Sequence, residues 1–114
     1  MNEGSVAYDA WVTFCDDFSR AYAGRRASLS VREDDESFMP IAKGLIFSGI
    51  SVDLKDSENA ATIMLSDDAG QHMTHIVSDV RVLFYQSDDA LVPTLLINSA
   101  HDGTVFLRID GVAG

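Results

Sequence analysis

The sequence of 114 residues has a single cysteine, Cys15, so no disulfide can form within the chain. It also has no apolar run near the roughly 20 residues that a membrane-spanning helix needs. Its N-terminus lacks the basic segment followed by an apolar one that is typical of a secretory signal. These absences fit a reducing compartment, and we expect a cytoplasmic protein that does not bind membranes.

Basic residues are scarce as well. Eight Lys and Arg stand against eighteen Asp and Glu, which gives a formal net charge of −10. A surface this acidic repels nucleic-acid phosphates and anionic lipids, so we expect no direct nucleic-acid binding. The simplest use of the acids is a well-solvated surface. A second use is an acidic face that imitates nucleic acid toward a basic protein partner.

Motifs of catalytic or phosphate-binding sites are missing. Ser48 lies in Phe-Ser-Gly-Ile, without the leading glycine of a nucleophile elbow. No Gly-x-Gly is present for a phosphate loop, and the acidic segment 33–37 lacks the aspartate spacing of a helix–loop–helix calcium site. We therefore assign no catalytic residue, no metal and no cofactor, and an enzyme is the least favoured class.

One amphipathic helix is predicted over residues 6–22, after a frayed end at residues 1–5. Ser5 could cap its start, and Gly24 follows its last periodic residue, where a left-handed backbone ends a helix easily. The apolar stripe places Cys15 among aromatic rings, so we expect a buried and unreactive thiol. The stripe consists of Trp11, Phe14, Cys15, Phe18 and Tyr22.

The rest of the chain predicts short strands separated by polar turns. Residues 38–41 fit only an edge or a connection because Pro40 cannot donate a hydrogen bond. Ser78 and Asp79 suit a tight two-residue connection. The predicted strands are residues 26–32, 45–54, 61–65, 72–77, 80–85, 91–97 and 104–109.

The strand at residues 45–54 changes phase at Ser48-Gly49. Leu45 and Phe47 alternate at odd positions, whereas the apolar residues from Ile50 onward alternate at even ones. One extra residue, as a β-bulge, would return both sets to the same face. Two short strands that meet at a bend are the alternative.

Together these elements predict a single domain, residues 1–114, of the α+β class. We expect the N-terminal amphipathic helix to pack on a curved antiparallel sheet or small β-barrel of six to seven strands. No second helix interrupts the predicted strands, so parallel crossovers are not expected.

Four residues are candidates for a binding site: Asp53, His72, His75 and Arg81. A histidine beside a carboxylate could hold a ligand or exchange a proton. His72 and His75 are three residues apart, which puts them on opposite faces of a strand and makes a poor zinc site. His101 lies in a predicted turn.

Several segments resemble a family of small, uncharacterised bacterial proteins, a domain of unknown function. They are Gly49–Asn59, Ile63–Leu65 and His72–Val77, with a Trp- and Phe-containing helix at Trp11–Phe18 and a Leu-Arg strand at Leu107–Arg108. The resemblance implies no activity, cofactor or substrate. It draws attention only to the segment from Gly49 to Asp53 and to the region of His75.

Two functions follow as expectations. The first is a small non-enzymatic binding or regulatory module that holds a ligand on the concave face of the sheet, or between helix and sheet. The second is an acidic protein-interaction module. It would act as a homodimer through an edge strand, or as an inhibitor of a basic nucleic-acid-binding partner.

Overall fold

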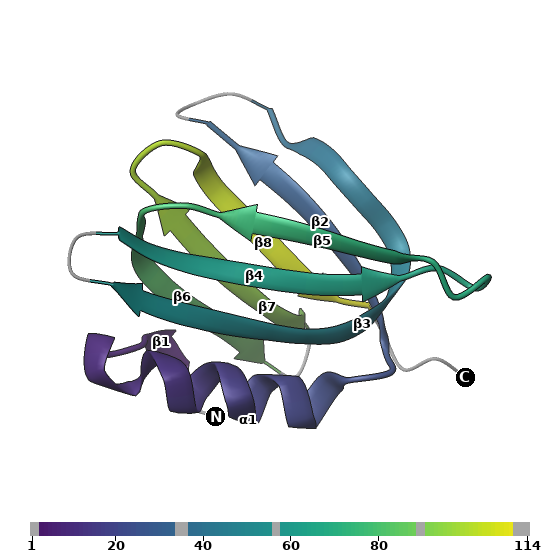
Figure 1. Ribbon diagram of the computed structural model, residues 1–114, viewed down its shortest axis with the longest axis horizontal. Helices are drawn as coiled ribbons and strands as arrows, with labels where there is room; N and C mark the ends of the chain where they lie inside the picture. Colours follow the sequence, from purple (N-terminus) through teal and green to yellow (C-terminus); the bar gives the residue numbers. More distant parts are fainter. Residues whose placement is uncertain (1–2, 34–36, 56–57, 89–90, 111–114) are drawn as a thin grey trace.

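A computed structural model describes residues 3–33, 37–55, 58–88 and 91–110 of this chain. It contains a 3-10 turn, one helix and eight strands that pair only in antiparallel fashion (Figure 1). This confirms the predicted N-terminal helix and antiparallel sheet. The elements are η1 (Tyr8–Ala10), α1 (Trp11–Tyr22), β1 (Gly4–Ser5), β2 (Arg26–Arg32), β3 (Met39–Lys55), β4 (Glu58–Ser66), β5 (His72–Val77), β6 (Val80–Asp88), β7 (Leu91–Ser99) and β8 (Gly103–Ile109).

The eight strands form one sheet in the order β1-β6-β7-β8-β2-β3-β4-β5. The predicted number of six to seven strands was too low, because the short β1 lies where a frayed end was expected. The sheet does not close into a barrel. β1 takes the outer edge of β6 at Phe84 and Tyr85, where β5 would have to pair to close it.

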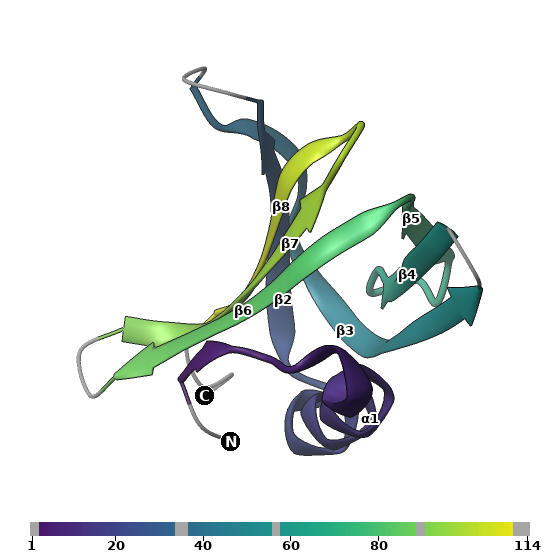
Figure 2. The same ribbon diagram turned by 90° about the vertical axis from the view of Figure 1, so that its left-hand side faces the viewer.

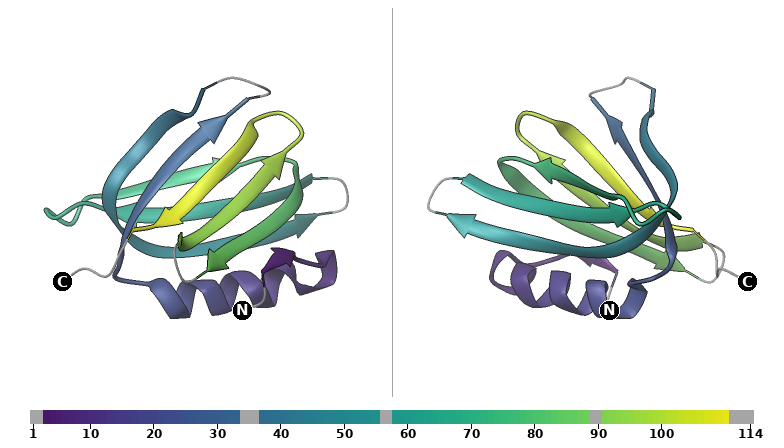
Figure 3. Two further views of the ribbon diagram at one scale, coloured as in Figure 1. Left: turned by 180° about the vertical axis from the view of Figure 1, so that it is seen from behind. Right: turned by 45° about the vertical axis from the view of Figure 1, so that its right-hand side comes forward.

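The sheet is bent so that its two halves face each other across the core (Figure 2). β3, β4 and β5 make one half, β6, β7 and β8 the other, and α1 lies across the open side below them (Figure 3). Core side chains therefore occupy the concave face and the gap between helix and sheet, the two surfaces where we expected a ligand. They include Trp11, Cys15, Phe18, Phe47, Ile63, Leu83, Ile97 and Leu107.

The predicted bulge in the long strand β3 is confirmed. Phe47 pairs with Leu65 and Gly49 with Met64, so Ser48 is the extra residue. Its insertion returns the apolar residues on both sides of it to the core face. Pairing of β3 with β4 therefore continues from one end of the hairpin to the other.

Helix α1 is attached to β3 just after this bulge. The Ser19 hydroxyl accepts a hydrogen bond from the Ile50 N–H at 2.8 Å and donates one to the Ile50 carbonyl at 3.0 Å. The helix packs close to Gly49, where an added Cβ would lie 3.5 Å from Ser19 Oγ, an ordinary van der Waals distance. Gly24 follows the helix with a φ of 90°, as predicted, and its N–H bonds to the Phe47 carbonyl.

The helix begins later than predicted. Ser5 belongs to β1 rather than to a helix cap, and the residue before α1, Ala10, makes no side-chain cap bond. The preceding chain is held by the sheet instead. The Val6 N–H donates to the Leu83 carbonyl, and the Trp11 indole donates to the Val6 carbonyl, each at 2.9 Å. These tertiary bonds keep Val6 out of the helix.

The connection from β5 to β6 has the predicted length but is not a hairpin. It carries the chain from one end of the sheet to the other, because β5 pairs with β4 and β6 with β7. Asp79 turns the chain with a φ of 49°, in the left-handed region that few residues other than glycine adopt. Its carbonyl accepts from the Ala100 N–H, which ties this corner to the turn between β7 and β8.

Candidate functional site

Two of the four predicted candidates lie near the corner at Asp79. Arg81, on β6, has its guanidinium 3.4 Å from the Asp79 carboxylate. Asp53, on β3, is exposed and lies 3.6 Å from the Lys55 ammonium. These residues come from separate strands, and the folded sheet brings their charges to one region.

The other two candidates lie on β5. His72 is exposed and His75 is half-buried on the opposite face, as the strand spacing predicts. His75 pairs with Ile63 across the sheet, and His72 with Ser66. Neither histidine has a polar side-chain contact among the described residues, so the structure gives them no carboxylate partner.

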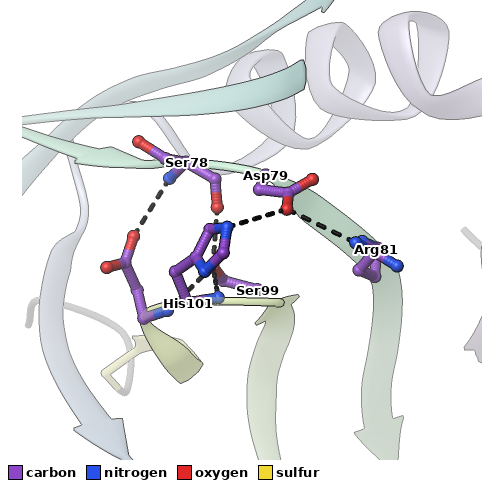
Figure 4. Close-up of polar contacts among 6 residues, drawn as sticks. Ser78, Asp79, Arg81, Ser99 and His101 are labelled. Carbon is purple, nitrogen blue, oxygen red and sulfur yellow. Dashed lines mark hydrogen bonds and ion pairs between the residues drawn. The ribbon is translucent and has the colours of Figure 1, made fainter. Parts of the chain in front are cut away.

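The histidine that does meet Asp79 is His101, in the turn between β7 and β8 (Figure 4). Its Nε2 lies 3.2 Å from Asp79 Oδ2. The Asp79 carboxylate is mostly buried, whereas both Arg81 and His101 are mostly exposed. The corner therefore presents a carboxylate held between two groups that reach toward solvent.

Hydrogen bonds from Ser99 hold this corner together. Its buried hydroxyl donates to the Ser78 carbonyl at 2.6 Å and accepts from the N–H groups of His101 and Asp102 at 3.1 and 3.0 Å. The Asp102 carboxylate in turn accepts from the Ser78 N–H at 3.2 Å. Because its hydroxyl proton goes to a backbone carbonyl, Ser99 is a structural residue here rather than a nucleophile.

A first hollow, the corner hollow, has a volume of about 330 Å³ and opens between the β3–β4 hairpin and the corner. Most of its charges already have partners: Asp53 faces Lys55, and Asp79 faces His101 and Arg81. Its lining is Asp53, Lys55, Glu58, Asn59, Ala60, Ser78, Asp79 and His101.

A second and larger hollow, the outer hollow, has a volume of about 640 Å³ and lies on the outward face of the sheet. The pairing of neighbouring strands places two rows of its lining residues side by side on this face. Leu96 of β7 pairs with Phe106 of β8, and one row further on Asn98 pairs with Thr104, which pairs with Arg32 of β2. His101 and Glu33 complete its rim. His101 thus lines both hollows.

Arg32 has no carboxylate partner in the part of the chain that the structure describes. Its guanidinium carbon lies 5.6 Å from the ring centre of Phe38, and that ring meets Phe106 edge-on at 4.8 Å. Nearby, the Asn98 amide donates to the Thr104 hydroxyl at 2.9 Å. The outer hollow therefore combines one aromatic ring, Phe106, with one cation and a fixed amide–hydroxyl pair, while Phe38 lies outside its lining.

Among the residues that the structure describes, two groups have shifted pKa values, and neither lines a hollow. Burial, helped by the neighbouring Asp16 carboxylate, raises the pKa of the Cys15 thiol to about 12, which confirms the expected inert cysteine. Burial and a hydrogen bond with Tyr85 raise the pKa of Tyr22 to about 12. Both groups belong to the contact between helix and sheet.

Within the described residues, no group of three or more His, Cys, Asp or Glu is arranged to hold a metal ion. In the same part of the chain, no helix is long and apolar enough to cross a membrane. No family model, curated protein or solved structure matches this chain. The resemblance to an uncharacterised bacterial family therefore stays a prediction.

No sequence motif singles out His101 or Arg32. His101 lies in an ordinary turn sequence, Ala-His-Asp-Gly, and Arg32 ends a strand whose polar face was expected to be wet. Both residues line the outer hollow only because the order of the strands brings β2, β7 and β8 together.

Proposed function

We propose that this protein is a small, non-enzymatic binding module whose ligand site is the outer hollow. Its ligand is a small molecule that carries a carboxylate next to an aromatic or apolar group. The observation that supports this proposal is Arg32, a cation without a described carboxylate partner that lines the hollow together with Phe106 and lies over the ring of Phe38, outside the hollow. Arginine binds carboxylates through two parallel hydrogen bonds, which fixes both position and orientation.

The size of the outer hollow agrees with this use. Small-molecule sites are typically hollows of roughly 300–1,000 Å³ with a few well-placed polar groups, and this one has about 640 Å³. The Asn98–Thr104 pair and His101 offer hydrogen bonds at the side of the hollow, while Leu96 and Phe106 offer apolar contact.

The alternatives within the molecule fit a ligand less well. The concave face of the sheet holds the core. In the corner hollow, the carboxylates of Asp53 and Asp79 already face cations, so a ligand there would have to displace existing ion pairs. Arg32 faces no carboxylate among the described residues, so an anion there displaces no described ion pair.

Charge sets a limit on affinity. The chain carries a net charge of −10 and repels an anion at long range. Glu33, at the rim, adds a carboxylate close to the site. Binding must therefore come from short contacts with Arg32 and the Phe106 ring, and we expect Glu33→Gln to strengthen the binding of an anion.

Benzoate and benzamide test the proposal, since they share a ring and differ in the carboxylate. Titration calorimetry should show that benzoate binds the protein more tightly than benzamide. Arg32→Gln should remove this preference, because it deletes the cation that pairs with the carboxylate.

Arg108→Gln is the matched control. Arg108 is exposed on β8, makes no described ion pair and lies outside the lining of the outer hollow. Its replacement changes the net charge by the same amount as Arg32→Gln but leaves the proposed site intact. The proposal fails if benzamide binds as tightly as benzoate, or if the Arg32 and Arg108 variants weaken benzoate binding to the same extent.

Two expectations from the sequence remain part of this proposal: the cytoplasm as compartment and the relation to an uncharacterised bacterial family. The second predicted class, an acidic protein-interaction module, would use a different surface, the free edge of β5.

A further inference from the structure

β5 is the end of the sheet that no described strand covers. It pairs with β4 on one side, and the strand order ends with it (Figure 1). At the other end of the sheet, β1 pairs with β6 and the Val6 N–H extends that pairing to Leu83. Among the described residues, the chain thus covers β6 around residues 83–85 and leaves the outer edge of β5 without a partner strand.

Proteins usually protect a free edge with a proline, a bulge or a charged side chain. β5 has none of these: its pairing with β4 runs without a register shift from Ala61–Val77 to Ser66–His72. Residues 69–78 contain no Asp, Glu, Lys or Arg. On its outward face Thr74 and Ile76 are exposed, and Ile76 has 57% of its surface accessible.

Carboxylates lie at both ends of this neutral strand. Asp67 and Asp68 form the turn before β5; Asp68 pairs with Arg26 at 2.7 Å, whereas Asp67 makes no described ion pair. Asp79 follows β5 and already pairs with Arg81 and His101, but the exposed Asp102 beside it makes no described ion pair and accepts a hydrogen bond from the Ser78 N–H. The edge therefore has a neutral centre with one carboxylate that lacks a described cation at each end, Asp67 and Asp102, on a chain with a net charge of −10.

We propose that the free edge of β5 binds an extended segment of a basic protein as an additional strand. Backbone hydrogen bonds would hold the segment's uncharged centre along residues 72–77, and its Lys or Arg residues would face the carboxylates at the two ends. Association with a basic partner is also favoured by the charge of the whole chain.

A second copy of this chain fits the edge less well than a basic partner. Antiparallel pairing of two β5 strands about a twofold axis places the Asp67–Asp68 turn of one copy beside Asp79 of the other. Carboxylates of one copy would then lie beside carboxylates of the other at both ends of the paired strands and would repel each other. The predicted homodimer is therefore an outcome of the test rather than the proposal.

A labelled peptide, Lys-Arg-Val-Thr-Val-Thr-Val-Arg-Lys, serves as the probe, and a second peptide has Glu in place of each Lys and Arg. Fluorescence anisotropy at low salt should show at least roughly ten-fold tighter binding of the basic peptide, with the difference shrinking as salt is added. Amide hydrogen exchange should show new protection of Met73–Val77 when the basic peptide is bound.

Thr74→Lys and Thr13→Lys form a matched pair of variants. Both replace an exposed threonine and change the net charge equally, but Thr13 lies on α1. Thr74→Lys should weaken binding roughly ten-fold, because a charged side chain in the middle of an edge strand disfavours the pairing of a further strand, and a positive charge there repels the basic peptide. Thr13→Lys should weaken it less than about two-fold. Circular dichroism of both variants checks that they fold.

Four results would overturn the proposal: no binding of the basic peptide, equal binding of both peptides, equal effects of the two variants, or protection outside β5. A solution mass of twice the 12.4 kDa of one chain, reduced to one chain by Thr74→Lys, would assign the edge to a second copy instead.

Discussion

Replacing Ser99 with alanine removes the side chain that fastens the corner of the candidate site. The Ser99 hydroxyl is buried and makes three hydrogen bonds, to the Ser78 carbonyl and from the N–H groups of His101 and Asp102. Alanine leaves all three backbone groups without this partner. The turn that carries His101 then loses one of its bonds to the β5–β6 connection, while those from Ala100 to Asp79 and from Ser78 to Asp102 remain.

The expected loss of stability depends on how well water can bond to the three backbone groups that the Ser99 hydroxyl leaves behind. A hydrogen bond contributes a net of roughly 0.5–1.5 kcal/mol, and a buried group left without a partner costs about 1–3 kcal/mol. Ser78, His101 and Asp102 are exposed residues, so water can satisfy part of what is lost. We therefore expect the free energy of unfolding to fall by about 2 kcal/mol, well below the sum of three separate bonds.

Urea unfolding followed by tryptophan fluorescence measures this change, with Ser51→Ala as the control. Ser51 is exposed on β3 and makes no described side-chain hydrogen bond, so its substitution should change stability by less than about 0.5 kcal/mol. Ser99→Ala should lower the urea concentration at the midpoint of unfolding without changing the slope of the unfolding free energy against urea concentration. If both variants are equally stable, the network at Ser99 does not hold the corner.

The remaining predictions concern a turn and the core. Gly103→Ala should lower the free energy of unfolding by about 2 kcal/mol or more, because φ is 73° and the new Cβ would lie 2.6 Å from the Arg32 carbonyl oxygen. Gly49→Ala, where the nearest atoms are 3.5 Å away, should cost less in the same assay; the reverse order would contradict the geometry. The raised pKa of Cys15 means that the unfolded thiol releases its proton at lower pH than the folded one. The free energy of unfolding should therefore fall as pH rises from 9.0 toward about 12, and Cys15→Ala should show a shallower fall.

Local patterns in the sequence were enough to predict most elements. The aromatic stripe from Trp11 to Tyr22 marked the helix, and alternation marked the strands. The phase change at Ser48-Gly49 even located the bulge. These features depend on neighbouring residues and on which face is apolar, so they can be found without knowing the fold.

Features that depend on distant contacts were missed. The start of α1 is delayed because Val6 bonds to β6, and two-residue β1 has no pattern of its own. Ser78-Asp79 looks like a hairpin turn in the sequence, yet it joins the two ends of the sheet. Strand order is set by the packing of the whole sheet, and it cannot be inferred from the turn residues alone.

The candidate site shows the same limit more strongly. Of the four nominated residues, Asp53 lines the corner hollow and Arg81 contacts Asp79, whereas His72 and His75 lie elsewhere on β5. The outer hollow draws on β2, β7 and β8, and the residues that matter most there, Arg32 and His101, belong to no motif.

Two-dimensional amide NMR during a benzoate titration tests the proposed site most directly. We predict that the largest shifts fall on Arg32 and on residues 96–106, which line the outer hollow, and that they disappear in Arg32→Gln. Shifts centred on α1 and the bulge of β3, or no shifts at all at millimolar benzoate, would contradict the account.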